Sequence, residues 1–83
     1  MVHDSKLRLR CLNSMLADAL PGGSFEVSGV KADNTVFIRV TSTTMMTATH
    51  AAFELIATFN ALGYKFVQTA DNKFRIPLEQ VQV

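Results

Sequence analysis

The sequence has no tryptophan, a single cysteine (Cys11), two prolines and no long hydrophobic run. A lone cysteine cannot form an intramolecular disulfide, which excludes a secreted scaffold held together by disulfides. No stretch approaches the roughly 18 apolar residues that indicate a membrane-spanning helix. Residues 1–6 are not followed by an apolar segment, so we expect no signal peptide. We therefore expect a cytoplasmic protein, in a host's cytoplasm if the gene is viral.

Charge is also sparse, since charged residues make up 18% of the chain and the formal net charge is +1. So small a net charge creates no large basic field, which argues against nucleic-acid binding driven by bulk charge. Hydrophobic residues make up 48%, which excludes disorder as the main state. The 83 residues suffice for one small domain, so we expect residues 1–83 to form a single domain.

In the first half of the chain, periodicity predicts a helix followed by a hairpin. The helix is expected over about residues 5–20, with an apolar stripe formed by Leu9, Leu12, Met15, Leu16, Ala19 and Leu20. Asp4 or Ser5 can cap its start, and Pro21-Gly22-Gly23 ends it. Alternating apolar residues then predict strands over 24–30 and 35–41. Asn34, in the turn between them, is expected to adopt a positive φ.

The second half has the same pattern. A helix is expected over about residues 45–62, with a core-facing stripe formed by Met45, Ala48, Ala52, Leu55, Ile56, Phe59 and Leu62. Gly63 then stands at the expected C-terminal cap. Strands are predicted over 64–69 and 73–78. The alternation continues through residues 79–83, as an extension of the last strand would require.

The two halves resemble each other. Residues 32–34 before Val36, Ile38 and Val40 match residues 70–72 before Phe74, Ile76 and Leu78, with an offset of 38. The offset drifts to 39 for the preceding strands and to 40 for the helices, where Leu16 matches Ile56. This pattern predicts an α+β fold of two tandem αββ units, about 5–41 and 44–78, with a four-stranded antiparallel sheet and both helices on one face. Chance similarity between two short hairpins is the alternative.

Strand periodicity assigns one face of this sheet to solvent. Its expected members are Glu26, Ser28, Phe37, Arg39, Lys65, Val67, Lys73 and Arg75, with a local charge of about +3. Such a face can bind an acidic protein, and cations beside an aromatic ring can also hold single-stranded nucleic acid. It can equally be an ordinary solvated surface. As the partner-binding set we select Phe37, Arg39, Lys65, Val67, Lys73 and Arg75.

The second helix carries more apolar residues than one stripe requires. Met46, Phe53 and Ala57 lie on its flank, where they pack against the first helix or form an alternative patch for a partner or a second copy.

Residues suited to catalysis are few. His50 and Glu54, four residues apart, could form an acid–base or metal pair, but a solvated polar stripe is the simpler interpretation. Cys11 is expected to be a partly buried structural thiol. The glycines of residues 21–24 lie between a helix and a strand, the wrong order for a phosphate loop. We expect no enzyme, no cofactor and no metal site.

The residues favour a small non-catalytic protein-binding domain, an inhibitor or adaptor such as a phage-encoded inhibitor of host defence. A nucleic-acid-binding domain that uses the basic sheet face is the alternative.

Overall fold

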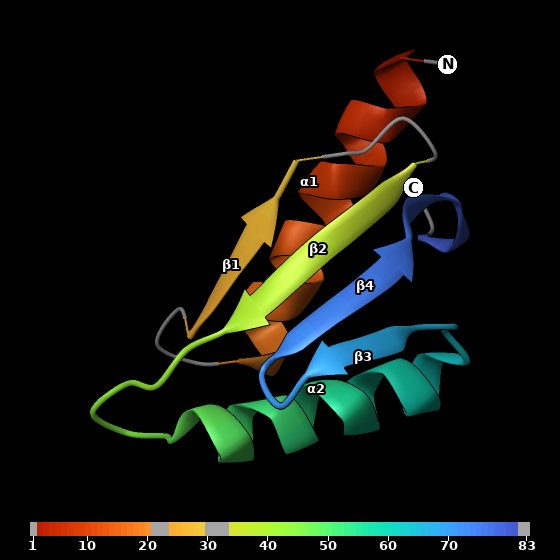
Figure 1. Ribbon diagram of the computed structural model, residues 1–83. Helices are drawn as coiled ribbons and strands as arrows, with labels where there is room; N and C mark the ends of the chain where they lie inside the picture. The colour runs from red at the N-terminus through yellow and green to blue at the C-terminus, as the bar shows by residue number, and fades with distance from the viewer. Residues whose placement is uncertain (1, 21–23, 30–33, 82–83) are drawn as a thin grey trace.

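The computed structural model describes residues 2–20, 24–29 and 34–81 and has the predicted order of elements (Figure 1). Helix α1 (Val2–Ala19) is followed by strands β1 (Phe25–Ser28) and β2 (Thr35–Val40). Helix α2 (Ala48–Leu62) is followed by strands β3 (Val67–Ala70) and β4 (Lys73–Pro77) and by a short 3₁₀ helix, η1 (Leu78–Gln80). The protein therefore has the expected α+β fold of two αββ units.

The four strands form one antiparallel sheet in the order β1-β2-β4-β3, with both helices on one face. Exchanging the two halves maps β1 onto β3 and β2 onto β4, which leaves this order unchanged. The sheet thus has the approximate two-fold symmetry expected of a tandem repeat. In Figure 1, α1 crosses behind the strands and α2 runs alongside β3.

The strand register locates the approximate two-fold axis. Phe37 and Arg75 are equivalent by the offset of 38, and they lie directly opposite each other on the central strands. The axis therefore passes between these two residues. At one end of the central pair, the Val40 N–H donates to the Asn72 carbonyl oxygen at 2.8 Å. At the other end, the Leu78 N–H donates to the Asn34 carbonyl oxygen, also at 2.8 Å.

The outer strands follow the expected drift in the repeat. Ser28 lies opposite Phe37, and Val67 lies opposite Arg75. Because Val67 is 39 residues after Ser28 and Arg75 is 38 after Phe37, the outer strands are related by an offset of 39, as predicted. The connection is therefore one residue shorter in the second half, where seven residues separate Val67 from Arg75, than in the first half, where eight separate Ser28 from Phe37.

The helices have an offset of 39 rather than the predicted 40. Three fully buried positions of α1 match three fully buried positions of α2 at this offset: Leu12, Leu16 and Leu20 correspond to Ala51, Leu55 and Phe59. Leu16 is therefore equivalent to Leu55, and Ile56 is only partly buried against the core. The prediction that Ile56 lies at the centre of the core-facing stripe was wrong, because the stripe is centred on Leu55.

Aromatic packing completes the core on the side of α2. The Phe59 ring contacts the rings of Phe66 and Tyr64, with centroids 5.2 and 6.0 Å away. It also meets Phe74 edge to face at 6.3 Å. Phe74 is fully buried, while Tyr64 and Phe66 are partly buried. All three follow α2 in the sequence, so Phe59 joins the helix to the second hairpin, as the strand alternation predicted.

Helix α2 begins three residues later than predicted. Thr47 is its N-cap, and the Thr47 hydroxyl oxygen accepts a hydrogen bond from the His50 N–H at 3.1 Å. The Ser42 hydroxyl oxygen accepts from the Ala48 N–H at 2.9 Å and closes the preceding loop. Met45 therefore lies outside the helix and is 84% exposed, contrary to its predicted place in the core.

The other end of α2 is capped as predicted, but its last apolar residue is exposed. Gly63 has a left-handed backbone with φ 72°, and its N–H donates to carbonyl oxygens of the last turn, including that of Asn60. Leu62 is 50% exposed, so its predicted place in the core was wrong. The Tyr64 N–H donates to the Phe59 carbonyl oxygen at 2.9 Å, which directs the chain toward β3.

The C-terminal tail turns into η1 instead of extending β4 as expected. The Gln80 side chain donates to the Lys65 carbonyl oxygen and accepts from the Lys65 N–H, both at 2.7 Å. The Arg8 guanidinium of α1 donates to the carbonyl oxygens of Glu79 and Val81. These contacts hold residues 79–81 against α1 and the segment before β3, so residues 78–80 do not extend β4, and residues 82–83 lie outside the described residues.

The remaining differences concern element ends. Helix α1 begins at Val2, so Asp4 and Ser5 lie within the helix rather than at its cap. Strand β3 covers 67–70 rather than 64–69, and β1 covers 25–28 rather than 24–30. The predicted helix stop at residues 21–23 and the turn residues 31–33 lie outside the described residues. Asn34 has φ 62°, as predicted.

Candidate functional site: the open face of the sheet

Two of the rows of side chains that cross the sheet face opposite the helices contain the residues selected from the sequence. One row joins Ser28, Phe37, Arg75 and Val67, and the other joins Glu26, Arg39 and Lys73. These are the residues that strand alternation predicted for this face, and the register now places them beside specific neighbours. Lys65 precedes β3 and is exposed.

The row through the approximate two-fold axis combines a cation with apolar neighbours. Arg75 lies directly between Phe37 and Val67 on the adjacent strands. Val67 is 49% exposed, whereas Phe37 is only partly exposed. Phe37 is the only aromatic residue that the strand register places on this face among the residues the structure describes. Apolar surface therefore borders the guanidinium of Arg75 on two sides.

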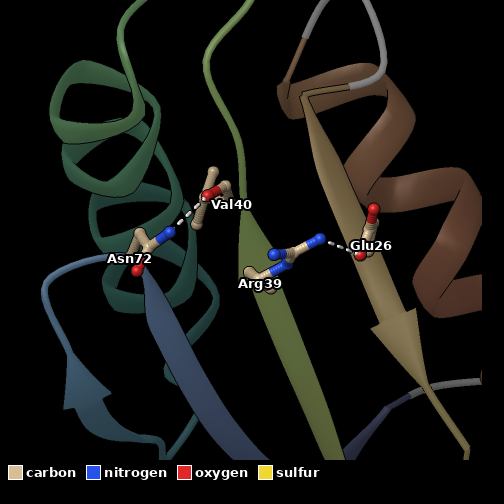
Figure 2. A network of polar contacts seen from close by, with 4 residues as sticks. All are labelled: Glu26, Arg39, Val40 and Asn72. Atoms are coloured by element: carbon tan, nitrogen blue, oxygen red, sulfur yellow. Dashed lines mark hydrogen bonds and ion pairs between the residues drawn. The ribbon is translucent and has the colours of Figure 1, made fainter.

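The second row contains an ion pair that the sequence pattern did not reveal. The Arg39 guanidinium donates to a carboxylate oxygen of Glu26 at 2.6 Å across β1 and β2 (Figure 2). Both side chains remain at least half exposed, at 50% and 63%. On its other side, Arg39 lies directly opposite Lys73. Two cations therefore occupy one cross-strand pair on the central strands, an arrangement that costs stability.

Charge is distributed unevenly over the face. Glu26, on the edge strand β1, forms an exposed ion pair with its neighbour Arg39. Within the described part of the chain, Lys73 and Arg75 on β4 and Lys65 before β3 form no ion pair. The positive charge of the face is thus concentrated on β4 and at Lys65, and this side would attract an acidic group.

A shallow hollow of about 270 Å³ lies in this face. Its lining includes side chains of Glu26, Ser28, Phe37, Arg39, Thr69 and Lys73. Thr69 was not selected from the sequence, although alternation from Lys65 and Val67 places it on this face. The register of β3 shifts between Gln68 and Ala70, so Thr69 lies at a β-bulge.

Asn72 fixes one end of the face. The Asn72 side-chain amide donates to the Val40 carbonyl oxygen at 2.9 Å (Figure 2). The backbone carbonyl oxygen of Asn72 accepts a hydrogen bond from the Val40 N–H. Both polar groups of the Val40 backbone are therefore bound by one residue. This clasp holds the turn between β3 and β4 beside the end of β2, next to the Arg39–Lys73 pair.

The alternative patch on α2 is divided by the structure. Phe53 is 66% exposed and Ala57 is also exposed. Met46 lies before the helix and is partly buried against the core, with its carbonyl oxygen accepting from the Thr43 N–H. Met46 therefore belongs to the loop packing, while Phe53 and Ala57 remain at the surface.

The weaker candidates for chemistry also have defined positions. The imidazole Nε2 of His50 lies 3.6 Å from the Glu54 carboxylate, and both side chains are largely exposed. Cys11 is partly buried, as predicted, and lines a cleft with Met15, Leu62 and Tyr64. Within residues 2–20, 24–29 and 34–81, no group of three metal-ligating side chains comes together and no helix is long and apolar enough to cross a membrane.

Comparison of the chain with protein-family models, curated proteins and solved structures finds no match.

The internal repeat allows the open-face residues of the two halves to be compared with each other. The cross-strand pair Glu26–Arg39 of the first half corresponds to Lys65 and Pro77 in the second. The side chains at these equivalent positions therefore differ between the two halves, although the backbone arrangement is the same. The difference gives the second half of the open face its excess of positive charge.

Proposed function

We propose that this chain is a small non-catalytic protein-binding domain whose open sheet face contacts an acidic surface of another protein. The observation that carries the proposal is the Arg39–Lys73 pair on the central strands, with Arg75 in the adjacent row. Like charges opposite each other destabilise a sheet. Proteins tend to retain such unfavourable arrangements at functional sites. An acidic partner surface would relieve the repulsion.

The composition of the face favours a protein over nucleic acid as the partner. Platforms for single-stranded nucleic acid stack two or three bases on aromatic rings. Among the described residues of this face, the single ring, Phe37, is partly buried, so little stacking surface is offered. The hollow lined by both polar and apolar side chains suits an acidic side chain with an apolar neighbour. Nucleic acid is the alternative, and the experiment below distinguishes it.

A domain of this kind acts by covering a partner's surface, as an inhibitor or an adaptor. A phage-encoded inhibitor of host defence, acting in the host cytoplasm, is one such role. Short connections between the strands leave little material for an enclosed active site.

Site-specific photo-crosslinking in the native cell tests the proposal. A photoreactive amino acid replaces Ser28 or Thr69 at the margin of the open face, and Asn13 on α1 serves as the control position. We expect protein adducts from the two sheet positions and not from the control. Adducts removed by nuclease would indicate nucleic acid instead, and equal labelling at all three positions would refute the assignment of this face.

Charge reversal provides a matched comparison. Lys73→Glu with Arg75→Glu changes the net charge as much as Lys6→Glu with Arg10→Glu, and all four residues are exposed. We expect only the first pair to abolish crosslinking from Ser28, because attraction at the contact becomes repulsion. Arg39 is left intact, since Arg39→Glu would place a second carboxylate beside Glu26. Equal loss in both variants would show a nonspecific charge effect and contradict the proposal.

A further inference from the structure

The outward side of α2 carries an uncharged strip that the core does not cover. Five residues form this strip: Thr49, Phe53, Ile56, Ala57 and Asn60. Phe53 is 66% exposed, and Ile56 is partly buried. Between the helix and β3 lies a groove of about 350 Å³, lined by strip residues together with Gln68 and Asp71. An aromatic ring therefore stands beside a groove at the edge of the sheet.

The internal repeat shows that the fold does not require this apolar strip. At the helix offset of 39, the positions of Thr49, Phe53 and Ala57 correspond to Arg10, Ser14 and Asp18 of α1. These three residues of α1 are exposed and polar, as the outward side of a helix usually is. Two of these three places are thus polar in the first half and apolar in the second, at Phe53 and Ala57. The difference marks the strip as a surface that contacts another molecule.

A two-fold axis can bring the strips of two copies of the chain into contact with each other. In an antiparallel pair of α2 helices, a two-fold axis near Leu55 places Phe53 of each copy against Ile56 of the other. The same axis places Thr49 opposite Asn60, because both pairs are centred on the same point of the helix. Self-contact of one patch through a two-fold axis is the commonest way in which soluble proteins form oligomers.

Charges at the two ends of the strip make it self-complementary. Asp71 lines the groove beside Thr49, near the start of α2. Lys65 lies two residues after the helix cap Gly63, near the other end of α2. Antiparallel pairing brings the Asp71 end of one copy beside the Lys65 end of the other, on both sides of the axis. We propose that the α2 strip is a homodimer interface whose occupant is a second copy of this chain.

Sedimentation velocity of the full chain, between roughly 1 µM and 1 mM, covers the affinities of small interfaces. We expect the mass to rise from that of the 9.1 kDa chain toward twice this value. Phe53→Asp should weaken the dimer by about tenfold or more, since it buries a charge without a partner. Ser14→Asp, at the equivalent position of α1, should leave the dimer unchanged. Circular dichroism checks that both variants remain folded.

A charge swap tests the pairing directly. Lys65→Asp and Asp71→Lys should each weaken the dimer several-fold, and the double variant should recover most of the loss, because the opposite charges meet again. A wild-type chain that stays monomeric throughout would overturn the proposal. So would equal weakening by Ser14→Asp, or a double variant weaker than both single ones. The Lys73→Glu, Arg75→Glu variant should dimerise normally, which separates this proposal from that of the open face.

Discussion

Replacing Phe59 with alanine should destabilise the protein more than any other truncation on α2. The Phe59 side chain is fully buried and contacts the rings of three other aromatic residues. Truncating a buried phenylalanine to alanine costs about 3–5 kcal/mol, and the cost is highest where the surroundings cannot collapse into the cavity. Because aromatic rings from two segments, residues 64–66 and β4, pack against this ring, we expect a value near 4–5 kcal/mol, which already includes the aromatic contacts.

The same helix offers a matched control. Phe53 is the same residue type six positions earlier, but it is 66% exposed. Phe53→Ala should change the stability of the monomer by less than about 0.5 kcal/mol, as is usual for surface substitutions. Both variants are compared at a protein concentration at which the chain is monomeric, so that the proposed dimer does not contribute.

Urea unfolding followed by circular dichroism measures both changes. A domain of this size has a total stability of about 4–12 kcal/mol, so Phe59→Ala should lower the midpoint greatly or leave the chain largely unfolded. In thermal unfolding the loss corresponds to a decrease in Tm of roughly 15 °C or more. Similar losses for Phe59→Ala and Phe53→Ala would show that the orientation of α2 on the sheet is wrong.

The remaining predictions concern three local contacts, each measured by urea unfolding. Thr47→Ala should cost about 1 kcal/mol because the N-cap hydrogen bond to the His50 N–H is lost, and Thr47→Ser should retain most of the stability; equal losses would contradict the capping role. Asn34→Ala should cost about 1–2 kcal/mol at φ 62°, whereas Asn34→Gly should be nearly neutral; the reverse order would exclude the left-handed turn. Arg8→Ala should cost about 1–3 kcal/mol through the lost hydrogen bonds to the tail, with Arg10→Ala as the exposed control, and no difference between the two would show that the Arg8 hydrogen bonds do not stabilise the tail.

The order of elements and the faces of the strands could be predicted because they depend on local periodicity. Val36, Ile38 and Val40 stand at every second position and are all buried, as are Phe74, Ile76 and Leu78. Gly63 and Asn34 have the backbone conformations that their residue types favour in turns. In each case the deciding interactions are within a few residues of one another in the sequence.

The start of α2 could not be predicted from periodicity, because residues 41–47 offer several potential caps. Met45 fits the helical spacing. The helix nevertheless begins later, where the hydroxyl oxygens of Ser42 and Thr47 accept hydrogen bonds from backbone N–H groups of its first turn. The tail posed a similar problem, since its alternation is overridden by contacts with Arg8 and Lys65 more than ten residues away. Both errors arose where side-chain hydrogen bonds compete with the apolar pattern.

The composition of the candidate site could be predicted, but its pairing could not. Strand periodicity assigned Arg39, Lys73 and Glu26 to one face without saying which of them are neighbours. The answer depends on the strand order β1-β2-β4-β3, a long-range property of the fold. The β-bulge between Gln68 and Ala70 depends on the same long-range pairing.

The tandem arrangement makes the two sides of the open face different from each other. In a symmetric dimer of two separate αββ chains, every residue would occur twice, and a partner could bind in either of two equivalent orientations. Here the halves are joined, so Glu26 and Arg39 occupy one side while Lys65 and Pro77 occupy the corresponding places on the other. A bound partner can therefore distinguish the two orientations, although the backbone beneath it is nearly symmetric.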